Sequence, residues 1–248
     1  MKIKTTLVAL IIFFLPSFLV AGILRLLGHK VGKNLHVGFS IIFANHIEFG
    51  NNVRIGHFNL FKIKRVNLSN FCSVGYMNIS KGPFDLILKE KASFGNKNYF
   101  TRGPKGISYG ISELRIGYNS RITVGHHLDL TQSISFGENS ILAGIRSQMW
   151  THGYYHADRG PERIRIDGET HIGDNVYIGS GCIFNPGVKV SNSIHIGGGS
   201  VIAKDLKIPG MYVGQSIRFI DNNIDKIKNK LTNVEERDLL DNVYTKKN

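Results

Sequence analysis

Cysteine, proline and charged residues are all scarce in this sequence, and each scarcity excludes a class of protein. Only two cysteines occur among the 248 residues, Cys72 and Cys182. Two thiols are too few for a disulfide framework, and they fit a reducing compartment. Six prolines beside 28 glycines indicate many tight turns rather than a collagen or a disordered chain. The hydrophobic content of 42% is enough for one large domain with appendages.

Acidic residues are also few: 18 Asp and Glu stand against 31 Lys and Arg, which gives a net charge of +13. Such an excess favours anionic partners, including membrane surfaces and phosphate groups. The basic residues are scattered, and neither a helix-turn-helix nor an RRM signature accompanies them. We therefore expect no nucleic-acid partner.

A long run near the N-terminus carries no charge at all: residues 5–24 read TTLVALIIFFLPSFLVAGIL. As a helix this run would reach about 30 Å, the thickness of a hydrocarbon core. Pro16 interrupts it in the middle, where proline breaks the hydrogen-bond ladder. Cations flank the run on both sides, at Lys2, Lys4, Arg25, Lys30 and Lys33.

Three interpretations of this apolar run compete. A cleaved signal peptide is disfavoured, because no small-x-small site is evident and the run continues too far. A single span, with the body retained inside by the following cations, is plausible. A helical hairpin kinked at Pro16, entering the membrane and returning, is equally plausible. All but the first predict that residues 1–30 are a membrane-anchoring segment.

The most regular feature is a six-residue repeat that continues without interruption to Ile208: IGDNVY, IGSGCI, FNPGVK, VSNSIH, IGGGSV, IAKDLK, IPG. Its first position is aliphatic or Phe, at Ile172, Ile178, Phe184, Val190, Ile196, Ile202 and Ile208. Short strands joined by turns produce a period of six. Three such strands close a triangular coil, and coils stack about 4.8 Å apart. The first position should point inward, with glycine or asparagine at the corners.

The same phase appears upstream, and the repeat therefore predicts one solenoid over most of the chain. It is present from Val31 through Val37, Phe43, Phe49 and Ile55, and it returns at Ile116. It appears again, out of phase, at Phe136 and Leu142. Between Gly82 and Glu113 the period fades, which predicts irregular coils with loops.

The C-terminal residues show a different pattern. Ile224, Ile227, Leu231 and Val234 have helical spacing after a candidate N-cap at Asp221. We predict an amphipathic helix and tail over 219–248. The remaining organisation is then a membrane-anchoring segment over 1–30 and a β-helix domain over 31–218, with a histidine-bearing loop over 148–170.

These residues resemble the hexapeptide-repeat acyltransferases, the family of left-handed parallel β-helix enzymes. The most specific stretch leads from WTHG (150–153) through IGDNVYIGSGCIFNPGVKV to GGGSVIAKDL. This layout is most similar to the galactoside, maltose and polysaccharide O-acetyltransferases. The resemblance implies an all-β fold, a left-handed parallel β-helix, together with acetyl-CoA as donor, a sugar or polysaccharide acceptor, a homotrimer and no metal.

The resemblance also implies a catalytic base, because the family carries one on a loop about twenty residues before the matching coil. His152 lies at that distance before Ile172. An alcohol is nearly always protonated at neutral pH, and a histidine with a pKa near 6.5 can take its proton as the oxygen attacks. His156, a second histidine that departs from the family pattern, is the other candidate and would hold the acceptor. Asp158 and Glu162 are the loop's own candidates for orienting the base.

The donor pocket implied by the resemblance is a groove between coils, in which the backbone groups of turns rich in small residues contact the donor. On this sequence it comprises Gly179, Ser180, Asn185, Gly198, Ala203 and Lys204, with Arg218 as a further cation. The two cations suit the phosphates of CoA. CoA supply and the cations after residue 24 together predict the cytoplasmic face of a bacterial inner membrane.

Three alternatives use the same fold. A γ-carbonic-anhydrase-like enzyme would bind zinc through His126 or His127 together with His152 and His156. Adjacent residues on a strand point in opposite directions, so only one of the first two faces any given site. A nucleotide-amino-sugar N-acyltransferase would use a soluble amine as acceptor. A non-catalytic scaffold leaves the histidine loop unexplained.

Overall fold

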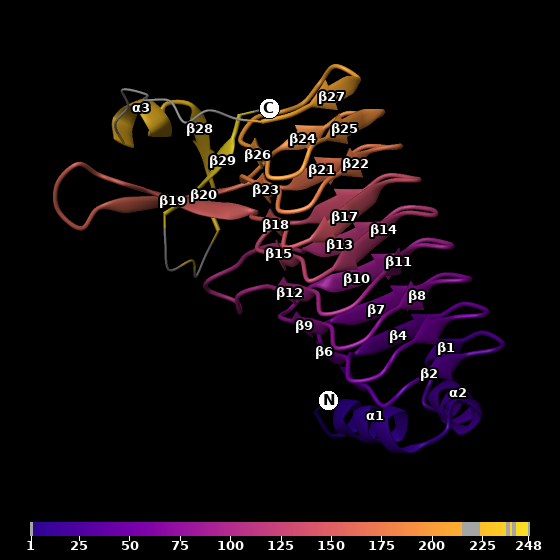
Figure 1. Ribbon diagram of the computed structural model, residues 1–248. Coiled ribbons are helices and arrows are strands. Elements are labelled where there is room, and N and C mark those ends of the chain that lie inside the picture. Colours follow the sequence, from indigo (N-terminus) through magenta and orange to yellow (C-terminus); the bar gives the residue numbers. More distant parts are fainter. Residues whose placement is uncertain (1, 215–223, 237–238, 240–241, 248) are drawn as a thin grey trace.

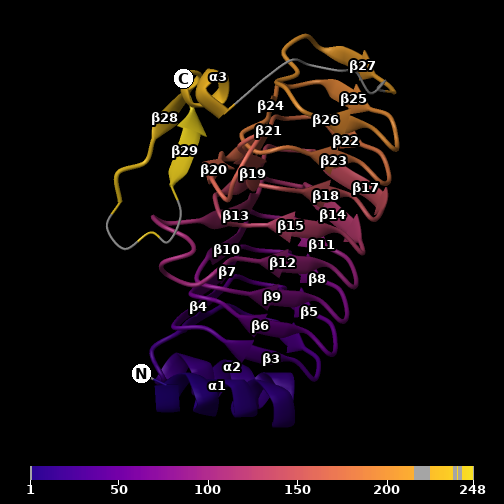
Figure 2. The same ribbon diagram turned by 90° about the vertical axis from the view of Figure 1, so that its left-hand side faces the viewer.

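Three parallel β-sheets run side by side along one axis and form the body of the protein (Figures 1 and 2). The computed structural model describes residues 2–214, 224–236, 239 and 242–247. Each coil of the chain gives one strand to each sheet in turn, so that every strand pairs with strands one coil before and after it. The arrangement is a parallel β-helix and is consistent with the left-handed coil that we expected. The all-β prediction is confirmed for the body.

We call the three sheets A, B and C. Sheet A contains β1 (Lys30–Val31), β4 (His46–Phe49), β7 (Arg65–Leu68), β10 (Asp85–Leu88), β13 (Glu113–Ile116), β16 (Ile134–Phe136), β21 (Thr170–Ile172) and β24 (Lys189–Val190). Sheet B contains β2 (His36–Val37), β5 (Arg54–Ile55), β8 (Ser73–Val74), β11 (Ser93–Phe94), β14 (Arg121–Val124), β17 (Ile141–Ile145), β22 (Tyr177–Ile178), β25 (Ile194–Ile196) and β27 (Gly210–Tyr212). Sheet C contains β3 (Ile41–Phe43), β6 (Leu60–Lys62), β9 (Ile79–Lys81), β12 (Tyr99–Thr101), β15 (His127–Asp129), β18 (Gln148–Met149), β23 (Ile183–Phe184) and β26 (Val201–Ile202).

The remaining elements lie at the two ends and on one side. A fourth sheet, the hairpin sheet, contains β19 (His152–His156), β20 (Arg163–Asp167), β29 (Val243–Lys246) and β28 (Leu231–Asn233). The helices are α1 (Lys2–Phe14), α2 (Ser17–Leu26) and α3 (Ile224–Lys228).

The core follows the six-residue period. The first positions from Ile172 to Ile202 are all buried, as are the fifth positions from Val176 to Leu206. Asparagines take the left-handed conformation at the corners, for example Asn139 at φ 53° and Asn175 at φ 55°, because their short side chain tolerates positive φ. Ile208 contradicts the inward prediction, since it is exposed. After Leu206 the chain leaves the repeat and rejoins sheet B only at β27.

After the first coil the upstream coils are longer than eighteen residues, and two predictions fail in the upstream region. Phe43 is not an inward position: Ile42 and Ala44 beside it are the buried residues. The next coil pairs His46 with Arg65, a spacing that shifts the phase. The predicted irregular coils between Gly82 and Glu113 are also wrong over much of that range, because β10, β11 and β12 continue the sheets in register.

The apolar N-terminal run folds as two short helices rather than one. α1 and α2 are separated at Pro16, which is the N-cap residue of α2, and they cover the first coil at one end of the solenoid (Figure 1). Val8, Ile12, Val20 and Leu24 are fully buried against that coil. Among the described residues no helix is both long and apolar enough to cross a bilayer. The two helices instead form an end cap on the solenoid, with a break at the proline.

The predicted C-terminal helix is also corrected. Only α3, five residues long, is helical in the described part of 219–248, and Leu231 lies in a strand. β29 pairs in parallel with β20, and Val243 on it is buried. Backbone pairing with a protruding hairpin thus prevails over helical spacing. The candidate N-cap Asp221 lies outside the described residues.

Candidate active site

The histidine-bearing loop is a β-hairpin that leaves the solenoid between β18 and β21 (Figure 1). β19 and β20 are antiparallel, with His152 opposite Asp167 at the base and His156 opposite Arg163 further out. The polar composition of the loop follows from this position, since the outer part of the hairpin stands in solvent. His152 is the residue of β19 nearest the body.

His152 is held by a carboxylate from the preceding coil. Its Nδ1 lies 2.8 Å from Oδ2 of Asp129, the last residue of β15. The Thr131 hydroxyl oxygen lies 3.1 Å from the same nitrogen. Asp129 is buried, whereas the His152 side chain is 29% exposed. A buried carboxylate therefore orients an imidazole that solvent and substrate can still reach.

Several further hydrogen bonds fix the Asp129 carboxylate. The Thr151 backbone N–H donates to Oδ2 at 3.0 Å and the Thr151 hydroxyl at 2.8 Å, while the Thr131 hydroxyl donates to Oδ1 at 2.9 Å. Burial acts to raise the pKa of Asp129, but the hydrogen bonds from His152 and Thr151 outweigh it, so the pKa is lowered. Asp129 is an anion at neutral pH.

The pair determines which nitrogen of His152 is free. The hydrogen bond to Asp129 raises the pKa of His152, and burial opposes this only in part. With an anionic acceptor beside Nδ1, that nitrogen carries the proton in the neutral ring, and Nε2 is the nitrogen that can accept one. This is the arrangement that a general base requires.

Aromatic rings surround the imidazole. The Trp150 ring centroid lies 6.3 Å from that of His152, and the Tyr154 centroid lies 6.1 Å away, both edge to face. Trp150 also contacts His127 at 5.0 Å and donates its indole N–H to Gln148. These contacts restrict the rotation of His152 and provide an apolar surface beside the base.

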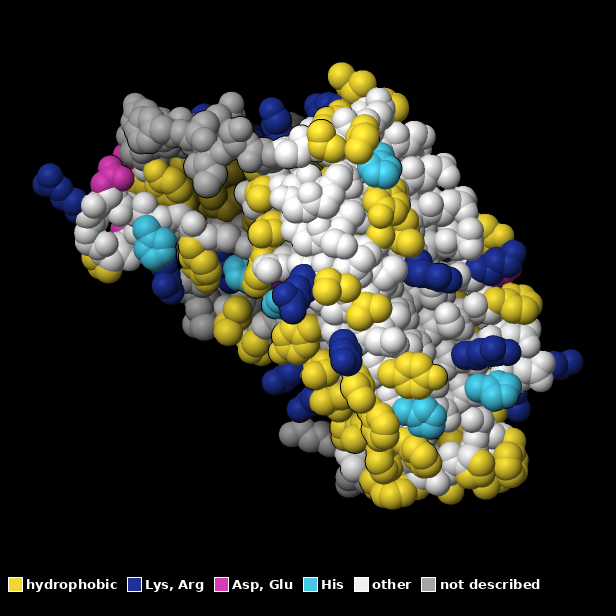
Figure 3. Space-filling model, viewed as in Figure 1, with side chains coloured by type: hydrophobic (Ala, Val, Ile, Leu, Met, Phe, Trp, Pro, Cys, Tyr) yellow, Lys and Arg dark blue, Asp and Glu magenta, His cyan; other side chains and the backbone are white. Residues whose placement is uncertain are grey.

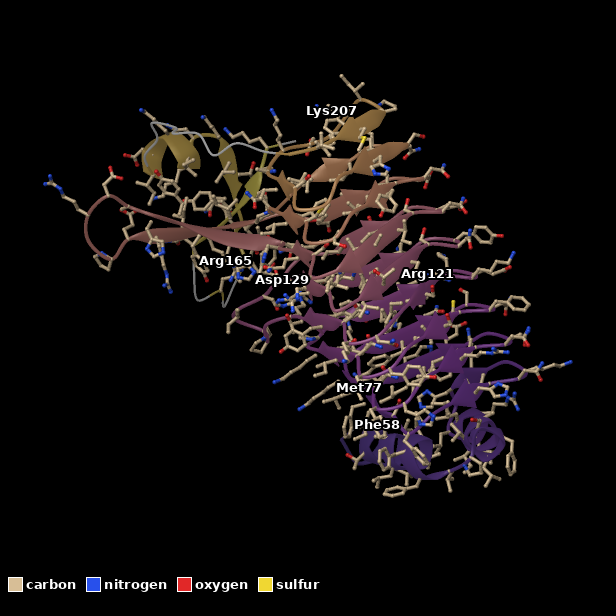
Figure 4. All side chains as sticks on the ribbon, viewed as in Figure 1. Phe58, Met77, Arg121, Asp129, Arg165 and Lys207 are labelled. Carbon is tan, nitrogen blue, oxygen red and sulfur yellow. The ribbon has the colours of Figure 1, made fainter. Side chains whose placement is uncertain are left out.

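A second buried charge network lies directly behind the hairpin base. Arg165 is fully buried and donates from Nε to Oδ1 of Asp167 at 2.8 Å and from Nη2 to Oδ2 at 3.1 Å. Gln132 donates to the same carboxylate at 3.2 Å. Burial raises the pKa of Asp167, and the Arg165 guanidinium opposes that rise. Figure 4 shows Arg165 and Asp129 on the side from which the hairpin projects.

The structure does not bring His156 to His152. His156 is exposed and lies four residues further along β19, a distance of roughly 13 Å on an extended strand. The loop carboxylates also fail as orienting groups: Asp158 and Glu162 are both exposed, and Glu162 pairs with Lys228 at 2.7 Å. Asp129, from outside the loop, takes the role that we had expected of them.

The register between neighbouring coils could have revealed Asp129. β15 pairs with β18, and His127 lies opposite Gln148. Counting two residues forward on each strand places Asp129 one coil below Trp150, immediately beside the start of the loop. Asp129 stands outside the loop, on the preceding coil, so the loop's own sequence carries no sign of it.

The donor candidates fall into two groups at the two ends of β23 and β26. Gly179, Ser180 and Gly198 share one corner, where the Gly199 N–H donates to the Ser180 carbonyl at 2.8 Å. A Cβ on Gly179 would lie 2.6 Å from the Gly198 nitrogen, so this corner requires glycine.

Asn185, Ala203 and Lys204 belong to the corner at the other end of the same strands. The Asn185 N–H donates to the Ile202 carbonyl at 2.9 Å, and Lys204 is exposed. Arg218, the second predicted cation, lies outside the described residues.

The three-histidine set of the zinc alternative does not form. His126 points into the body, where its Nδ1 accepts the Ser147 N–H at 3.1 Å, and burial lowers its pKa to about 4. His127 points outward, as strand alternation requires, while His156 stands away on the hairpin. In the part of the chain that the structure describes, no three His, Cys, Asp or Glu side chains gather as a metal site.

Comparison with known proteins finds partial similarities. No family model matches the chain. The chain is similar to the galactoside O-acetyltransferase of Escherichia coli, with 28% identity over 148 residues that cover 57% of this chain and 70% of that enzyme. The predicted resemblance to the hexapeptide-repeat acyltransferases is confirmed. The chain is an enzyme, an acyltransferase.

Two further similarities are more partial. A putative acetyltransferase of Staphylococcus aureus is 35% identical over 74 residues, which are 29% of this chain and 36% of that protein. Among solved structures, the polySia-specific acetyltransferase NeuO is 18% identical, with a TM-score of 0.43 and coverage of 79% of this chain and 86% of the other.

Proposed function

We propose that this acyltransferase moves an acetyl group from acetyl-CoA to a sugar hydroxyl of a surface polysaccharide or its lipid-linked precursor, with His152 as general base. The observation that supports this most is the 2.8 Å contact between His152 Nδ1 and the buried Asp129 carboxylate. It leaves Nε2 as the basic nitrogen of a side chain that is 29% exposed, which is the group needed to activate an alcohol.

The reaction follows from that geometry. Nε2 of His152 takes the proton of the acceptor hydroxyl as its oxygen attacks the thioester carbonyl carbon. The resulting imidazolium is stabilised by the Asp129 carboxylate on the other nitrogen. The tetrahedral intermediate then releases the CoA sulfur, and the proton on Nε2 passes to that sulfur, so the histidine is neutral again. General-base assistance of this kind contributes typically about 10²–10⁴ in rate.

The same pair favours a hydroxyl over an amine as acceptor. A neutral amine attacks a thioester without prior loss of a proton, whereas an alcohol at neutral pH needs a base. The N-acyltransferase alternative therefore makes less use of the Asp129–His152 pair. Purified enzyme offered a sugar and its amino counterpart distinguishes the two: we expect transfer to the hydroxyl and its loss in His152→Ala, and transfer to the amine alone would favour the alternative.

Acetyl-CoA would lie along the outer face of β23 and β26. The close approach of Gly179 and Gly198 exposes backbone groups at one end, and Lys204 stands exposed at the other. Peptide groups suit the pantetheine arm, and a lysine suits a phosphate.

A homotrimer is the assembly we propose, with sheet C at the contact between copies. One of the two outward rows of sheet C is mostly apolar: Ile41, Leu60, Ile79, Tyr99, His127, Gln148, Ile183 and Val201. The corresponding row of sheet A is mostly charged or polar: Lys30, Glu48, Asn67, Ile87, Arg115, Ser135, His171 and Lys189. An apolar exterior row indicates a surface covered by a partner, and it continues directly to the donor candidates.

The cellular site that we propose is the cytoplasmic face of a bacterial inner membrane, since acetyl-CoA is supplied from the cytoplasm. Protease added to spheroplasts should leave the body intact, and cleavage from the outside would refute this orientation. The decisive test of the activity itself is mass spectrometry of surface polysaccharides from cells with the gene, without it, and with His152→Ala. Acetyl esters should appear only in the first.

A further inference from the structure

The helices α1 and α2 are apolar on almost all sides, but only one side of each helix is buried. Their inner sides pack on the first coil, whereas Leu7, Leu10, Phe14, Phe18 and Leu26 on the outer sides are exposed. Phe14 is 69% exposed, Phe18 75% and Leu26 88%. Water-exposed apolar side chains in such number on one end of a protein mark a surface that contacts something else.

This apolar end continues onto the first coils. Phe39 and Phe58, at successive corners beside the helices, are also exposed, and the Phe13 and Phe39 rings lie 6.0 Å apart. Figure 3 shows hydrophobic side chains gathered at the α1–α2 end, with Lys or Arg side chains beside them, and Figure 4 shows Phe58 and Met77 towards that end. We call the surface formed by the outer sides of α1 and α2 with Phe39 and Phe58 the apolar end.

A basic groove adjoins the apolar end. It has a volume of about 690 Å³ and is lined by Thr5 of α1, by apolar side chains and by cations: Phe43, Ile63, Pro83, Pro104, Lys62, Lys64, Lys81 and Arg102. Lys62 and Lys81 are register partners on adjacent strands. Like charges directly opposite each other destabilise a sheet, and no carboxylate in the described part of the chain pairs with either lysine. An anion in the groove would relieve this repulsion.

The charge of this region determines which partner fits. No acidic residue occurs before Glu48, whereas five lysines and arginines do. A second copy packed end to end would bring two such basic surfaces together. A bilayer of anionic phospholipid supplies both an apolar layer for the exposed helix sides and phosphates for the lysines.

We propose that the apolar end rests in the headgroup region of an anionic phospholipid bilayer without crossing it, and that Lys62 and Lys81 bind a lipid phosphate in the groove. The exposed side chains of α1 and α2 enter the boundary between headgroups and acyl chains. This attachment needs none of the catalytic residues, so it holds or fails independently of the acetyl-transfer function.

Vesicle sedimentation with the purified full chain tests the proposal. We expect the protein to sediment with vesicles of equal parts phosphatidylglycerol and phosphatidylcholine, and weakly with phosphatidylcholine alone. The double variant Lys62→Glu/Lys81→Glu should lose about tenfold or more in affinity for the anionic vesicles. Lys89→Glu/Lys97→Glu makes the same change in net charge at two exposed positions of a more distant coil, and it should bind more tightly than the groove variant.

A second variant tests the apolar contribution. Phe14→Ser/Phe18→Ser should also lose vesicle binding, because both side chains are exposed and would otherwise enter the bilayer. Circular dichroism and acetyl transfer to a soluble sugar report whether each variant is folded, and neither should change. Inorganic phosphate at constant ionic strength should not displace the vesicles. Displacement would show that the groove binds free phosphate rather than lipid.

Three results would overturn the proposal. Equal binding of wild type to neutral and anionic vesicles would remove the role of charge. If Lys62→Glu/Lys81→Glu and Lys89→Glu/Lys97→Glu lost equal affinity for the anionic vesicles, the net charge of the protein, and not the groove, would be responsible for binding. An end-to-end dimer that forms without lipid and separates in Phe14→Ser/Phe18→Ser would identify a second copy as the occupant.

Discussion

The Asp129 carboxylate lies 2.8 Å from Nδ1 of His152 although 23 residues separate the two along the chain. Asp129 ends a strand of one coil, and His152 begins the hairpin that leaves the next. The contact therefore depends on coil stacking rather than on the loop's own sequence. A change in the register of either coil would separate the base from its carboxylate while leaving both residues in place.

Replacing the carboxylate should change the pH dependence of the reaction. His152 must be neutral to act as a base, and its pKa is raised above 6.5 chiefly by Asp129. The kcat/KM of the wild type should therefore rise with pH through a value above 6.5. In Asp129→Asn this limb should move to lower pH, and kcat should fall because the amide no longer selects the correct tautomer. Thr131→Val keeps the carboxylate and should leave the limb in place; an unmoved limb in Asp129→Asn would contradict the pairing.

The two loop histidines should differ sharply. His152→Ala should lower kcat by about 10²–10⁴, the usual contribution of a general base. His156→Ala, an exposed position far along β19, should keep kcat and at most raise the KM for the sugar acceptor. Steady-state kinetics with both substrates varied separates these effects. A His152→Ala enzyme that retained more than half of its activity would refute the assignment.

Lys204 should affect donor binding alone. It would contact the nucleotide end of acetyl-CoA, remote from the reacting carbon, so Lys204→Ala should raise the KM for acetyl-CoA with little change in kcat. Acetyl-pantetheine, which lacks the nucleotide, is the control donor. If Lys204→Ala raises the KM equally for acetyl-CoA and for acetyl-pantetheine, the lysine does not bind the nucleotide end.

The assembly is tested by introducing a charge on the apolar row. Ile79→Arg on sheet C should shift the protein from trimer to monomer in light scattering, because a buried unpaired arginine is costly at an interface. Ile141→Arg, an outward position of sheet B, is the matched control and should stay trimeric. Wild type that is monomeric and fully active would exclude a cleft shared between copies.

The buried Arg165–Asp167 pair should be important for stability. Arg165→Met leaves the Asp167 carboxylate buried without its partner, which typically costs about 3–5 kcal/mol in the free energy of unfolding. Glu162→Gln removes the exposed contact with Lys228 and should change the denaturation midpoint little. Urea denaturation followed by circular dichroism measures both. Equal midpoints for the two variants would contradict the buried network.

The fold was largely predictable because the repeat is local. Each aliphatic first position, such as Ile178 or Ile196, occupies the same place in every eighteen-residue coil, and a reading along the chain is sufficient to find it. The prediction failed where the phase of the repeat shifted, as at Phe43, and where the repeat ended, as at Ile208.

The site was predictable only in part, for a physical reason of the same kind. His152 lies on a recognisable stretch of sequence, whereas Asp129 reaches it through stacking between coils of unequal length. The sequence around Leu231 and Val243 likewise does not indicate strands. The strands β28 and β29 form only because the protruding hairpin offers an unpaired edge. Contacts of this kind depend on register over many residues, which a local pattern does not specify.

The number of coils between the α1–α2 end and the hairpin fixes the distance between that end and the candidate active site along the solenoid axis. Five strand spacings separate β3 from β18 in sheet C, which at about 4.8 Å each is roughly 24 Å. Any surface that holds the α1–α2 end therefore keeps the chemistry at that height, and an acceptor anchored to the same surface must extend that far to be modified. Because each coil contacts only its neighbours, adding or removing one complete coil would change the height by a single increment and leave the chemistry intact.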